Sequence, residues 1–528
     1  MIKRIVSNLL LLWIIIFQEQ GFAEKNKSSN SLKIALPEAE KIENFDTAKI
    51  RLGSQFILLD SLYSTLVTFN NENKIVAEAA SKFYWKGSEL IFEIRKDLKA
   101  SDGSRITAED VKASFNRLLL LGNTNMHGNL QNFLCTKRTP RNLEESCDGI
   151  EVKNNSLHLK FPKKYPTFVS LFSALDFAII PKKAIDKKDY SISDYSITSG
   201  PYSYSHKDKN GNLILKRSKF YKFSKAHYGQ ADLIEIWDDN FNKETGKLSS
   251  VEWFEKGLID HIPTTNRWKK ADLNRLSKKS GVTHHITDEL SVNFVAFTKK
   301  GMKIPHKERL KIAKTFITEV SNFRRLTKYQ KGIPEYLYKR RIQFFLPGGY
   351  GALSKEQVSE VESSFEKIKG SLPRKKIKIA VVESVYDFFS NRVFKNLKDQ
   401  VEWVRSDRVN NYANIDVNDP DAPDLMILSQ DVTFTEELGV IEFTLNWGGF
   451  PIKDKVKIDK WISKYINEDS FEERSSLLRS LHKDAILDNI SMIPMYATPY
   501  RALSKNGWKM DFSTNSAVNP FWQLYLEK

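Results

Sequence analysis

The stretch from residue 75 to residue 117 constrains the fold most, because it predicts a strand, a tight turn and a capped helix in succession. Residues 90–95 (Leu-Ile-Phe-Glu-Ile-Arg) are rich in β-branched and aromatic side chains, which favours a strand. Asp102-Gly103 is a turn signal, because Gly adopts positive φ and Asp can bond to its own backbone. Thr107 followed by Asp110 predicts a helix N-cap with an acidic first turn. The stretch therefore predicts a β-turn-α unit.

Periodicity along the rest of the chain predicts alternating strands and helices. The expected strands lie at residues 32–36, 150–152, 157–161, 177–181, 292–298, 376–382 and 424–428, and the expected helices at 56–69, 168–175, 307–323 and 388–401. Such alternation favours an α/β fold. A chain of 528 residues exceeds what one hydrophobic core usually serves, so we expect two or more lobes.

The formal net charge of +17 raises the question of a nucleic-acid partner. Basic residues are densest at residues 324–341, where nucleic-acid binding and a solvated surface are both possible readings. No nucleic-acid recognition motif accompanies this patch, so we favour the solvated surface and expect no nucleic-acid partner.

The N-terminus has the pattern of a secretory signal peptide. Lys3-Arg4 is followed by an apolar run at residues 9–17 and by the small-x-small site Gly21-Phe22-Ala23. This run is shorter than the roughly 20 residues that span a bilayer. We expect residues 1–23 to be removed after Ala23. Because no Cys lies near that site, we expect a freely soluble periplasmic protein without a lipid anchor.

The chain has only two cysteines, Cys135 and Cys147, in a polar segment. Their spacing also allows a metal site, but two cysteines without nearby His make a poor zinc site. An oxidising compartment favours a disulfide between them.

The order of residues in several segments resembles a known family. The matching residues are Ala79-Ala80-Ser81-Lys82-Phe83, Phe92-Glu93-Ile94-Arg95, Asp102-Gly103, Thr107-Ala108-Glu109-Asp110-Val111 and Ser114-Phe115 with Arg117; then Ser199-Gly200-Pro201-Tyr202 and the stretches 213–221 and 254–260. They resemble the signature of the extracytoplasmic solute-binding proteins of peptide-type ABC importers (oligopeptide- and dipeptide-binding, family 5), which includes L-A-x-x-[WFY], F-x-L-R, D-G-x-x-[LIF]-T-A-x-D-V and S-[FY]-x-R.

The resemblance implies a two-lobed periplasmic binding protein fold (type II, cluster C), with mixed sheets flanked by helices and two hinge crossovers. The implied division is lobe I at residues 24–290 and 500–528, with an extra N-terminal subdomain at about 48–180, and lobe II at residues 291–499.

The resemblance also implies the function. It implies a monomeric receptor that captures short peptides between its lobes and delivers them to permease subunits of an inner-membrane ABC importer. It implies no cofactor and no enzymatic activity. Departures from the family pattern at Ser218, Thr298 and around Asp431 leave two alternatives open. The same fold could bind another solute (a metal chelate, a sugar or an opine), or act as a ligand sensor or interaction protein for a membrane receptor.

Motif searches support the absence of enzymatic activity. Ser-x-x-Lys occurs at Ser364 and at Ser480, but Lys279-Ser280-Gly281 precedes both, which reverses the order in penicillin-binding enzymes. His284-His285 could bind a metal, but neighbouring residues on a strand point to opposite faces. We therefore expect the two histidines to lie at the protein surface as ordinary polar residues, and we expect no metal site.

Five residues are candidates for contacting the ligand. A free peptide carries an ammonium group, which is costly to desolvate without a partner. Asp431 stands where the resemblance implies the ammonium acceptor, with a loop-capping role as the alternative. Ser54 and Gln55 precede the first helix and could contact ligand or cap a turn. Tyr386 and Trp447 could line a cleft or fill the core.

Overall fold

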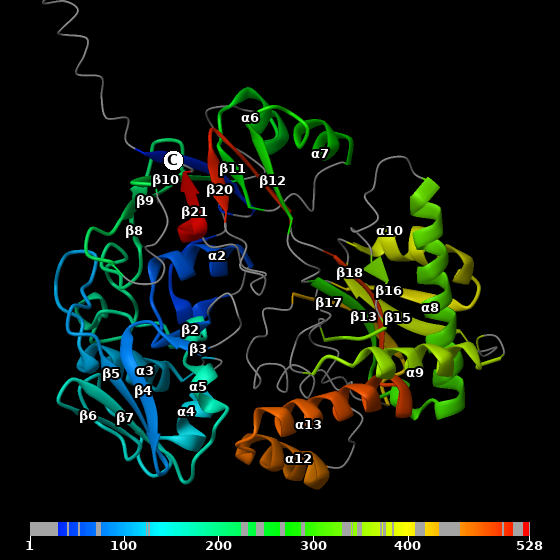
Figure 1. The fold of residues 1–528 in the computed structure, drawn as a ribbon, viewed down its shortest axis with the longest axis horizontal. Coiled ribbons are helices and arrows are strands. Elements are labelled where there is room, and N and C mark those ends of the chain that lie inside the picture. The colour runs from blue at the N-terminus through cyan, green and yellow to red at the C-terminus, as the bar shows by residue number, and fades with distance from the viewer. Residues whose placement is uncertain are drawn as a thin grey trace, which may run out of the picture.

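A computed structural model describes most of the chain (Figure 1). The described residues are 30–37, 39, 42–50, 53–69, 75–122, 124, 127–222, 231–238, 248–263, 270–286, 291–329, 339–340, 342–345, 351–369, 372, 376–382, 385–406, 418–431, 455–498, 501–510 and 521–526. They form two large mixed sheets, a smaller antiparallel sheet and helices packed against all three. The expected signal peptide lies outside the described residues.

The first large sheet combines strands from both ends of the chain. Its order is β12 (Val282–Ile286), β19 (Arg501–Lys505), β11 (His261–Ile262), β1 (Ser31–Leu36), β10 (Leu233–Asp238), β9 (Leu213–Arg217) and β8 (Tyr202–Lys207). β1 runs parallel to β10 and β11, whereas β19 is antiparallel to β11 and β12. Helices α6 (Ser250–Lys256) and α7 (Lys270–Leu276) share a core with this sheet, in which Trp253 contacts Trp237 edge to face.

The second large sheet has six strands. Its order is β14 (Lys339–Arg340), β18 (Met492–Thr498), β13 (Ser291–Phe297), β17 (Leu425–Asp431), β15 (Ile377–Val382) and β16 (Val401–Ser406). Helices α8 (His306–Tyr329), α9 (Lys355–Glu366), α12 (Lys455–Asn467) and α13 (Phe471–Lys483) surround it. β13 lies inside this sheet and is apolar on both sides. Val295 belongs to one buried cluster and Phe294 to another, which explains its nearly continuous apolar sequence.

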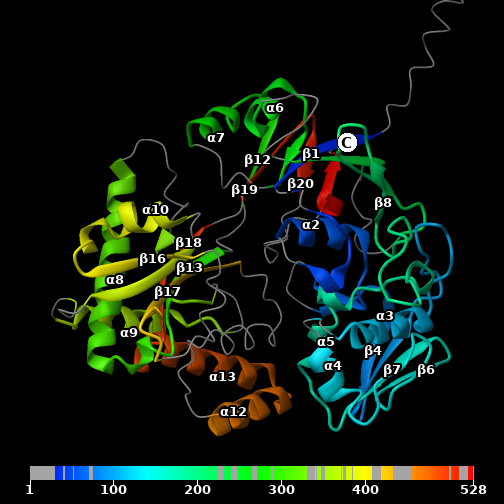
Figure 2. The same cartoon turned by 180° about the vertical axis from the view of Figure 1, so that it is seen from behind.

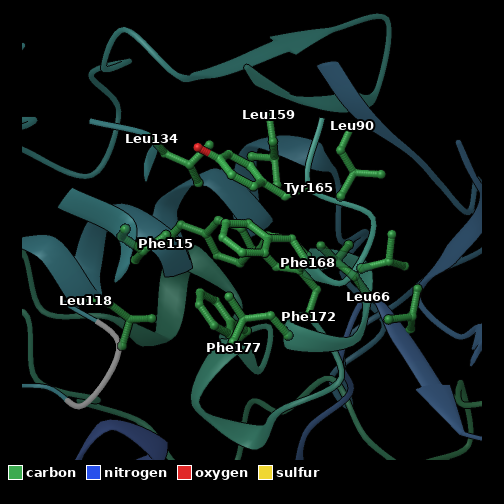
Figure 3. Close-up of a cluster of buried hydrophobic side chains, with 14 of the residues drawn as sticks. Leu66, Leu90, Phe115, Leu118, Leu134, Leu159, Tyr165, Phe168, Phe172 and Phe177 are labelled. Atoms are coloured by element: carbon green, nitrogen blue, oxygen red, sulfur yellow. The ribbon is translucent and has the colours of Figure 1, made fainter. Parts of the chain in front are cut away.

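The third sheet forms an N-terminal subdomain. It is antiparallel, in the order β4 (Ala80–Lys86), β5 (Glu89–Ile94), β7 (Ser156–Lys160) and β6 (Ile150–Lys153). Helices α3 (Ala108–Leu121), α4 (His127–Phe133) and α5 (Phe168–Leu171) accompany it. Figure 3 shows the aromatic centre of its core, where the ring of Phe172 stacks on Phe115 and meets Phe177 edge to face.

The predicted helix cap at Thr107 is present. The backbone N–H of Thr107 donates to Asp110 Oδ2 over 2.8 Å, and the Thr107 side chain caps the first turn of α3 in return. The other carboxylate oxygen of Asp110 accepts from the backbone N–H of Lys182 over 2.9 Å, and Ser114 Oγ accepts from the N–H of Ile180. The polar face of α3 therefore attaches the subdomain to the segment that leads back to the first sheet.

One turn further along α3, Arg117 forms a buried ion pair with Asp46. Nη2 of Arg117 lies 2.5 Å from Oδ2 of Asp46, and the two side chains are only 1% and 2% exposed. Nε of Arg117 also donates to the carbonyl of Tyr190 over 2.7 Å, and Oδ1 of Asp46 accepts from the N–H of Ala48. Removing one partner would leave the other charge buried and uncompensated.

The two blocks of family-like residues contact each other. The hydroxyl of Tyr221 donates to the buried carboxylate of Glu78 over 3.1 Å, next to Ala79. Gly103 has φ +87° and lies so close to Phe220 that a Cβ would be 2.8 Å from its ring. These motif residues therefore hold the subdomain against the first sheet.

The fold class expected from sequence is confirmed: the protein is a two-lobed α/β protein with mixed sheets. The chain passes between the large sheets twice, from the end of β12 to the start of β13 and from the end of β18 to the start of β19. Figure 2 shows the two lobes from behind, with the subdomain below the first sheet. The exact residue limits of the lobes stay a prediction.

Four expected elements differ from the observed ones. The helix expected at 56–69 is α2 (Gly53–Leu62), followed by β2 (Val67–Phe69), which pairs with β3 (Ile75–Ala77). The N–H of Gly200 donates to the carbonyl of Leu62, and a Cβ on Gly200 would lie 2.5 Å from the Leu62 backbone. The carbonyl at the end of α2 therefore accepts from Gly200 instead of from the next helical turn. The segment around Gly200, which leads into the first sheet, fills the space where the helix would continue.

The other three differences concern two helices and one strand. The helix expected at 168–175 is the short α5, and the described residues 178–181 form no strand, because Ile179 and Ile180 bond to Ser64 and Ser114 instead. The helix expected at 388–401 is interrupted: α10 (Tyr386–Phe388) continues as a π-turn and a 3₁₀ turn, and Val401 already begins β16.

The predicted disulfide is present. Cys135 and Cys147 are bonded, with their Cα atoms 5.3 Å apart, and both side chains are buried in the subdomain core.

A buried histidine, His482 on α13, connects this helix to two loop segments. The backbone N–H of Phe344 donates to Nε2 over 2.7 Å, so the ring proton must be on Nδ1, which donates to the carbonyl of Gly351 over 2.9 Å. Burial lowers the pKa of His482 from 6.5 to about 4. The folded chain therefore keeps the ring neutral at pH values where the unfolded chain binds a proton.

We expect Arg117→Met to lower the free energy of unfolding by about 3–5 kcal/mol, because it leaves the Asp46 carboxylate buried without its cation. Urea denaturation followed by tryptophan fluorescence would measure this loss. Glu151→Gln is the matched control, because Glu151 pairs with two exposed lysines at the surface and its removal should cost less than about 1 kcal/mol. Equal losses for the two variants would contradict the structural role of the buried pair.

We expect acid to destabilise the protein through His482. Because its folded pKa lies below the unfolded one, stability is full above pH 6.5 and falls as the pH drops towards 4, by roughly 3 kcal/mol for this residue. His482→Gln should be less stable at pH 7 but should lose less stability across this range. The exposed His206→Gln is the control and should keep the wild-type pH dependence, measured by urea denaturation at each pH. An unchanged slope in His482→Gln would contradict the assignment.

Candidate functional site

One edge of the first sheet collects the ends of the strands that lead towards the second lobe. Ile286 ends β12 and pairs with Arg501, which begins β19. On the same edge, Leu36 at the end of β1 pairs with Asp238 at the end of β10. This edge therefore carries the carboxyl ends of four strands that run in the same direction.

One edge of the second sheet has a corresponding arrangement. Ser291 begins β13 and pairs with Asp431 at the end of β17 and with Thr498 at the end of β18. β15 and β16 are parallel and end here as well, with Val382 opposite Ser406. The predicted ligand residue Asp431 thus has its backbone at this edge; its side chain is outside what the structure describes.

The two edges are held opposite each other by the crossovers. Consecutive Cα atoms are about 3.8 Å apart, so the chain from Thr498 to Arg501 spans at most about 11 Å. The second connection, from Ile286 to Ser291, spans at most about 19 Å. We call these two edges the facing edges. In open α/β sheets, ligands bind beyond the carboxyl ends of the strands, which makes the facing edges the candidate site.

Tyr386, a predicted ligand residue, follows the end of β15 as the first residue of α10. Its half-buried ring lies under the guanidinium of Arg405, whose central carbon is 4.0 Å from the ring centroid, and Trp403 meets it edge to face. Arg405 is exposed and stands one residue before the end of β16. Sequence reasoning missed Arg405; its position at the end of a strand is the signal that could have found it.

Ser54 and Gln55, the predicted residues of the first lobe, lie in the first turn of α2 and are buried, at 8% and 4% exposed. The Ser54 hydroxyl has no hydrogen-bond partner among the described residues. The structure therefore places these two residues in one lobe, and Tyr386 and Asp431 in the other. Trp447 lies outside the described residues.

The facing edges also carry exposed apolar side chains, which sequence reasoning did not single out. Ile286 is 41% exposed at the end of β12, Val382 is 37% exposed at the end of β15, and Val385, just before α10, is 38% exposed. Apolar walls with a few polar groups are typical of small-molecule sites.

The structure corrects the expectation that His284-His285 forms a polar surface. The two side chains do point to opposite faces of β12, but His285 is buried, and its Nε2 lies 3.2 Å from Ser504 Oγ. His261 approaches the same hydroxyl, with Nδ1 at 2.8 Å. Burial lowers the pKa of His285 to about 4, so the ring is neutral at physiological pH.

Neither a metal cluster nor a membrane span is found in the ranges described above. No group of three or more His, Cys, Asp or Glu residues there is arranged to hold a metal ion. No helix there combines the length and the apolar character that crossing a bilayer requires.

A cavity of about 280 Å³ lies away from the facing edges. Its walls come from the end of α6, the connection from α7 to β12 and the turn after β19, including Lys279 and Lys505. Lys505 pairs with Val282 at the opposite end of the β12–β19 ladder from Ile286 and Arg501. This cavity is therefore not part of the candidate site.

Comparison with solved structures finds the same fold over almost the whole chain. DppA from Helicobacter pylori, solved with the peptide STSA, is 14% identical, covers 94% of this chain and 98% of its own, and has a TM-score of 0.67. NikA from Brucella suis with Fe(III)-EDTA is 16% identical, covers 94% and 100%, and has a TM-score of 0.70. The Escherichia coli murein tripeptide binding protein MppA is 17% identical, covers 94% and 98%, and has a TM-score of 0.63.

The search of curated proteins finds no match. Residues 74–303 match the family described as "Bacterial extracellular solute-binding proteins, family 5 Middle". This range includes both blocks of family-like residues and ends just beyond the first crossover. Over this range the chain is thus similar to bacterial extracellular solute-binding proteins of family 5.

Proposed function

We propose that this protein is the solute receptor of an ABC importer. It captures a small solute between its two lobes and delivers it to the permease subunits in the inner membrane. It catalyses no reaction itself. It acts in the periplasm as a monomer, after removal of residues 1–23 and without a lipid anchor.

The observation that carries this proposal is the geometry of the facing edges. Strands of both sheets end there, and the two crossovers keep the edges close while leaving the lobes free to rotate. A few residues at the end of an element can absorb such a rotation. Closure around a solute would bury the exposed apolar side chains of Ile286, Val382 and Val385, which favours binding.

Short peptides are the solute class that the site chemistry fits best. Asp431 would receive the ammonium group, because its backbone lies at the facing edge, next to Ser291. Arg405 would receive a carboxylate, because its exposed guanidinium is oriented by the Tyr386 ring at the same edge. Pairing both ends of a zwitterion offsets the cost of removing them from water. The similar fold of H. pylori DppA, solved with a peptide, supports this class.

Native mass spectrometry on protein purified from periplasm without refolding tests the function. We expect a ladder of adduct masses that correspond to short peptides. A single adduct with the mass of a metal chelate, a sugar or an opine would keep the receptor function and replace the peptide class. A bare chain whose melting temperature does not respond to a peptide library would contradict the receptor function.

We expect Asp431→Asn to weaken binding of an identified peptide by about 10- to 100-fold, because it removes the charge opposite the ammonium group. Isothermal titration calorimetry would measure the change. Asp421→Asn is the matched control: its side chain is 91% exposed, pairs with Lys378 and lies beyond the other end of β17, so affinity should not change. The N-acetylated peptide should bind wild type and Asp431→Asn equally. Unchanged affinity for the free peptide in Asp431→Asn would remove the ammonium role.

A further inference from the structure

The two lobes meet at a second place, at the end of the molecule opposite the crossovers. The connection between α12 and α13 in the second lobe approaches the segment after β7 in the subdomain, and Figures 1 and 2 show this proximity from both sides. Nζ of Lys164 lies 2.6 Å from Oδ1 of Asp469, although the two residues are 305 positions apart in sequence. We call this ion pair the tip contact.

The charges on the two sides of the tip contact are complementary. Lys163 and Lys164 are adjacent and exposed on the subdomain. On the other side, acidic residues gather at the end of α12 and the start of α13; they are Glu468, Asp469, Glu472 and Glu473. Opposite patches of this kind attract each other over several ångströms.

Apolar packing continues across the lobes as well. One uninterrupted cluster of buried side chains contains Phe161 and Tyr165 of the subdomain together with Tyr465 and Ile466 of α12. Lys164 directly precedes Tyr165, and Asp469 follows Ile466 by three residues. The tip contact therefore lies beside residues that already belong to the shared apolar cluster.

The position of the tip contact determines what happens when the lobes open. The crossovers are the only covalent connections between the two large sheets within the described ranges, so opening is a rotation about them. Such a rotation displaces the points farthest from the crossovers the most. The tip contact must therefore break on opening, whereas the paired strands within each sheet stay intact.

We propose that the tip contact is a latch that biases the lobes towards the closed arrangement. The two side chains are 44% and 67% exposed, so their attraction is weak and sensitive to salt. A weak pair is suited to this role, because a strong one would prevent solute release. The physiological meaning of the latch rests on the proposed receptor function, in which opening and closing admit and release the solute.

The latch predicts the behaviour of charge-reversed variants without any ligand. Asp469→Lys and Lys164→Asp should each shift the ratio of open to closed molecules towards open by about fivefold at low salt. The double variant Lys164→Asp/Asp469→Lys restores an attractive pair and should return the ratio to that of wild type. Raising NaCl from 20 to 500 mM should reduce the difference between wild type and single variants.

Single-molecule fluorescence energy transfer on the full mature chain measures this ratio. Dyes attached through azide-bearing residues at the exposed positions Lys86 on β4 and Lys464 on α12 report the separation of the lobes and leave the disulfide intact. Glu151→Lys is the control, because it reverses one partner of an exposed ion pair within the subdomain and should leave the ratio unchanged.

Two results would overturn the latch: single reversals with a wild-type ratio, or a double variant that stays as open as the single ones. Because no ligand is present in this experiment, its outcome is independent of the receptor function. If the mass spectrometry and calorimetry described above found no solute binding, the open-to-closed ratio could still be measured. That result would remove the proposed purpose of the latch but not the latch itself.

Discussion

The buried ion pair between Arg117 and Asp46 is the interaction on which the arrangement of the first lobe depends. Asp46 belongs to the connection between β1, at the centre of the first sheet, and α2, which carries Ser54 and Gln55. Arg117 belongs to α3, the central helix of the subdomain. The pair therefore holds the connection to α2 against the subdomain. Both side chains are almost fully buried, so separating the two charges would leave each without its partner in the interior.

The same helix shows why family-like residues need not lie in the ligand site. Asp110, Ser114 and Arg117 follow one another on one face of α3, and each bonds to a segment that leads to or from the first sheet. The adjoining face carries Phe115 and Leu118 into the aromatic core of the subdomain. The motif thus specifies an attachment between two structural units.

The lobes are connected in two unlike ways. At one end, two short crossovers link the sheets covalently and limit the separation of the facing edges. At the other end, the tip contact between Lys164 and Asp469 is exposed and breakable, beside shared apolar packing. Permanent linkage at one end and reversible linkage at the other is an arrangement in which a solute between the facing edges can change the balance between open and closed states.

The sequence by itself determined the α/β class, the capped helix at Thr107 and the disulfide, because each depends on residues close together in the chain. It did not determine where α2 ends, because Gly200 and Ser199 stop it from a distant segment. The sequence also predicted a surface position for His285. In the structure its ring is buried and lies within hydrogen-bond distance of the Ser504 hydroxyl on β19. The facing edges come from strands far apart in the chain, such as those that end at Ile286 and begin at Arg501, and only the pairing of those strands decided which residues lie together.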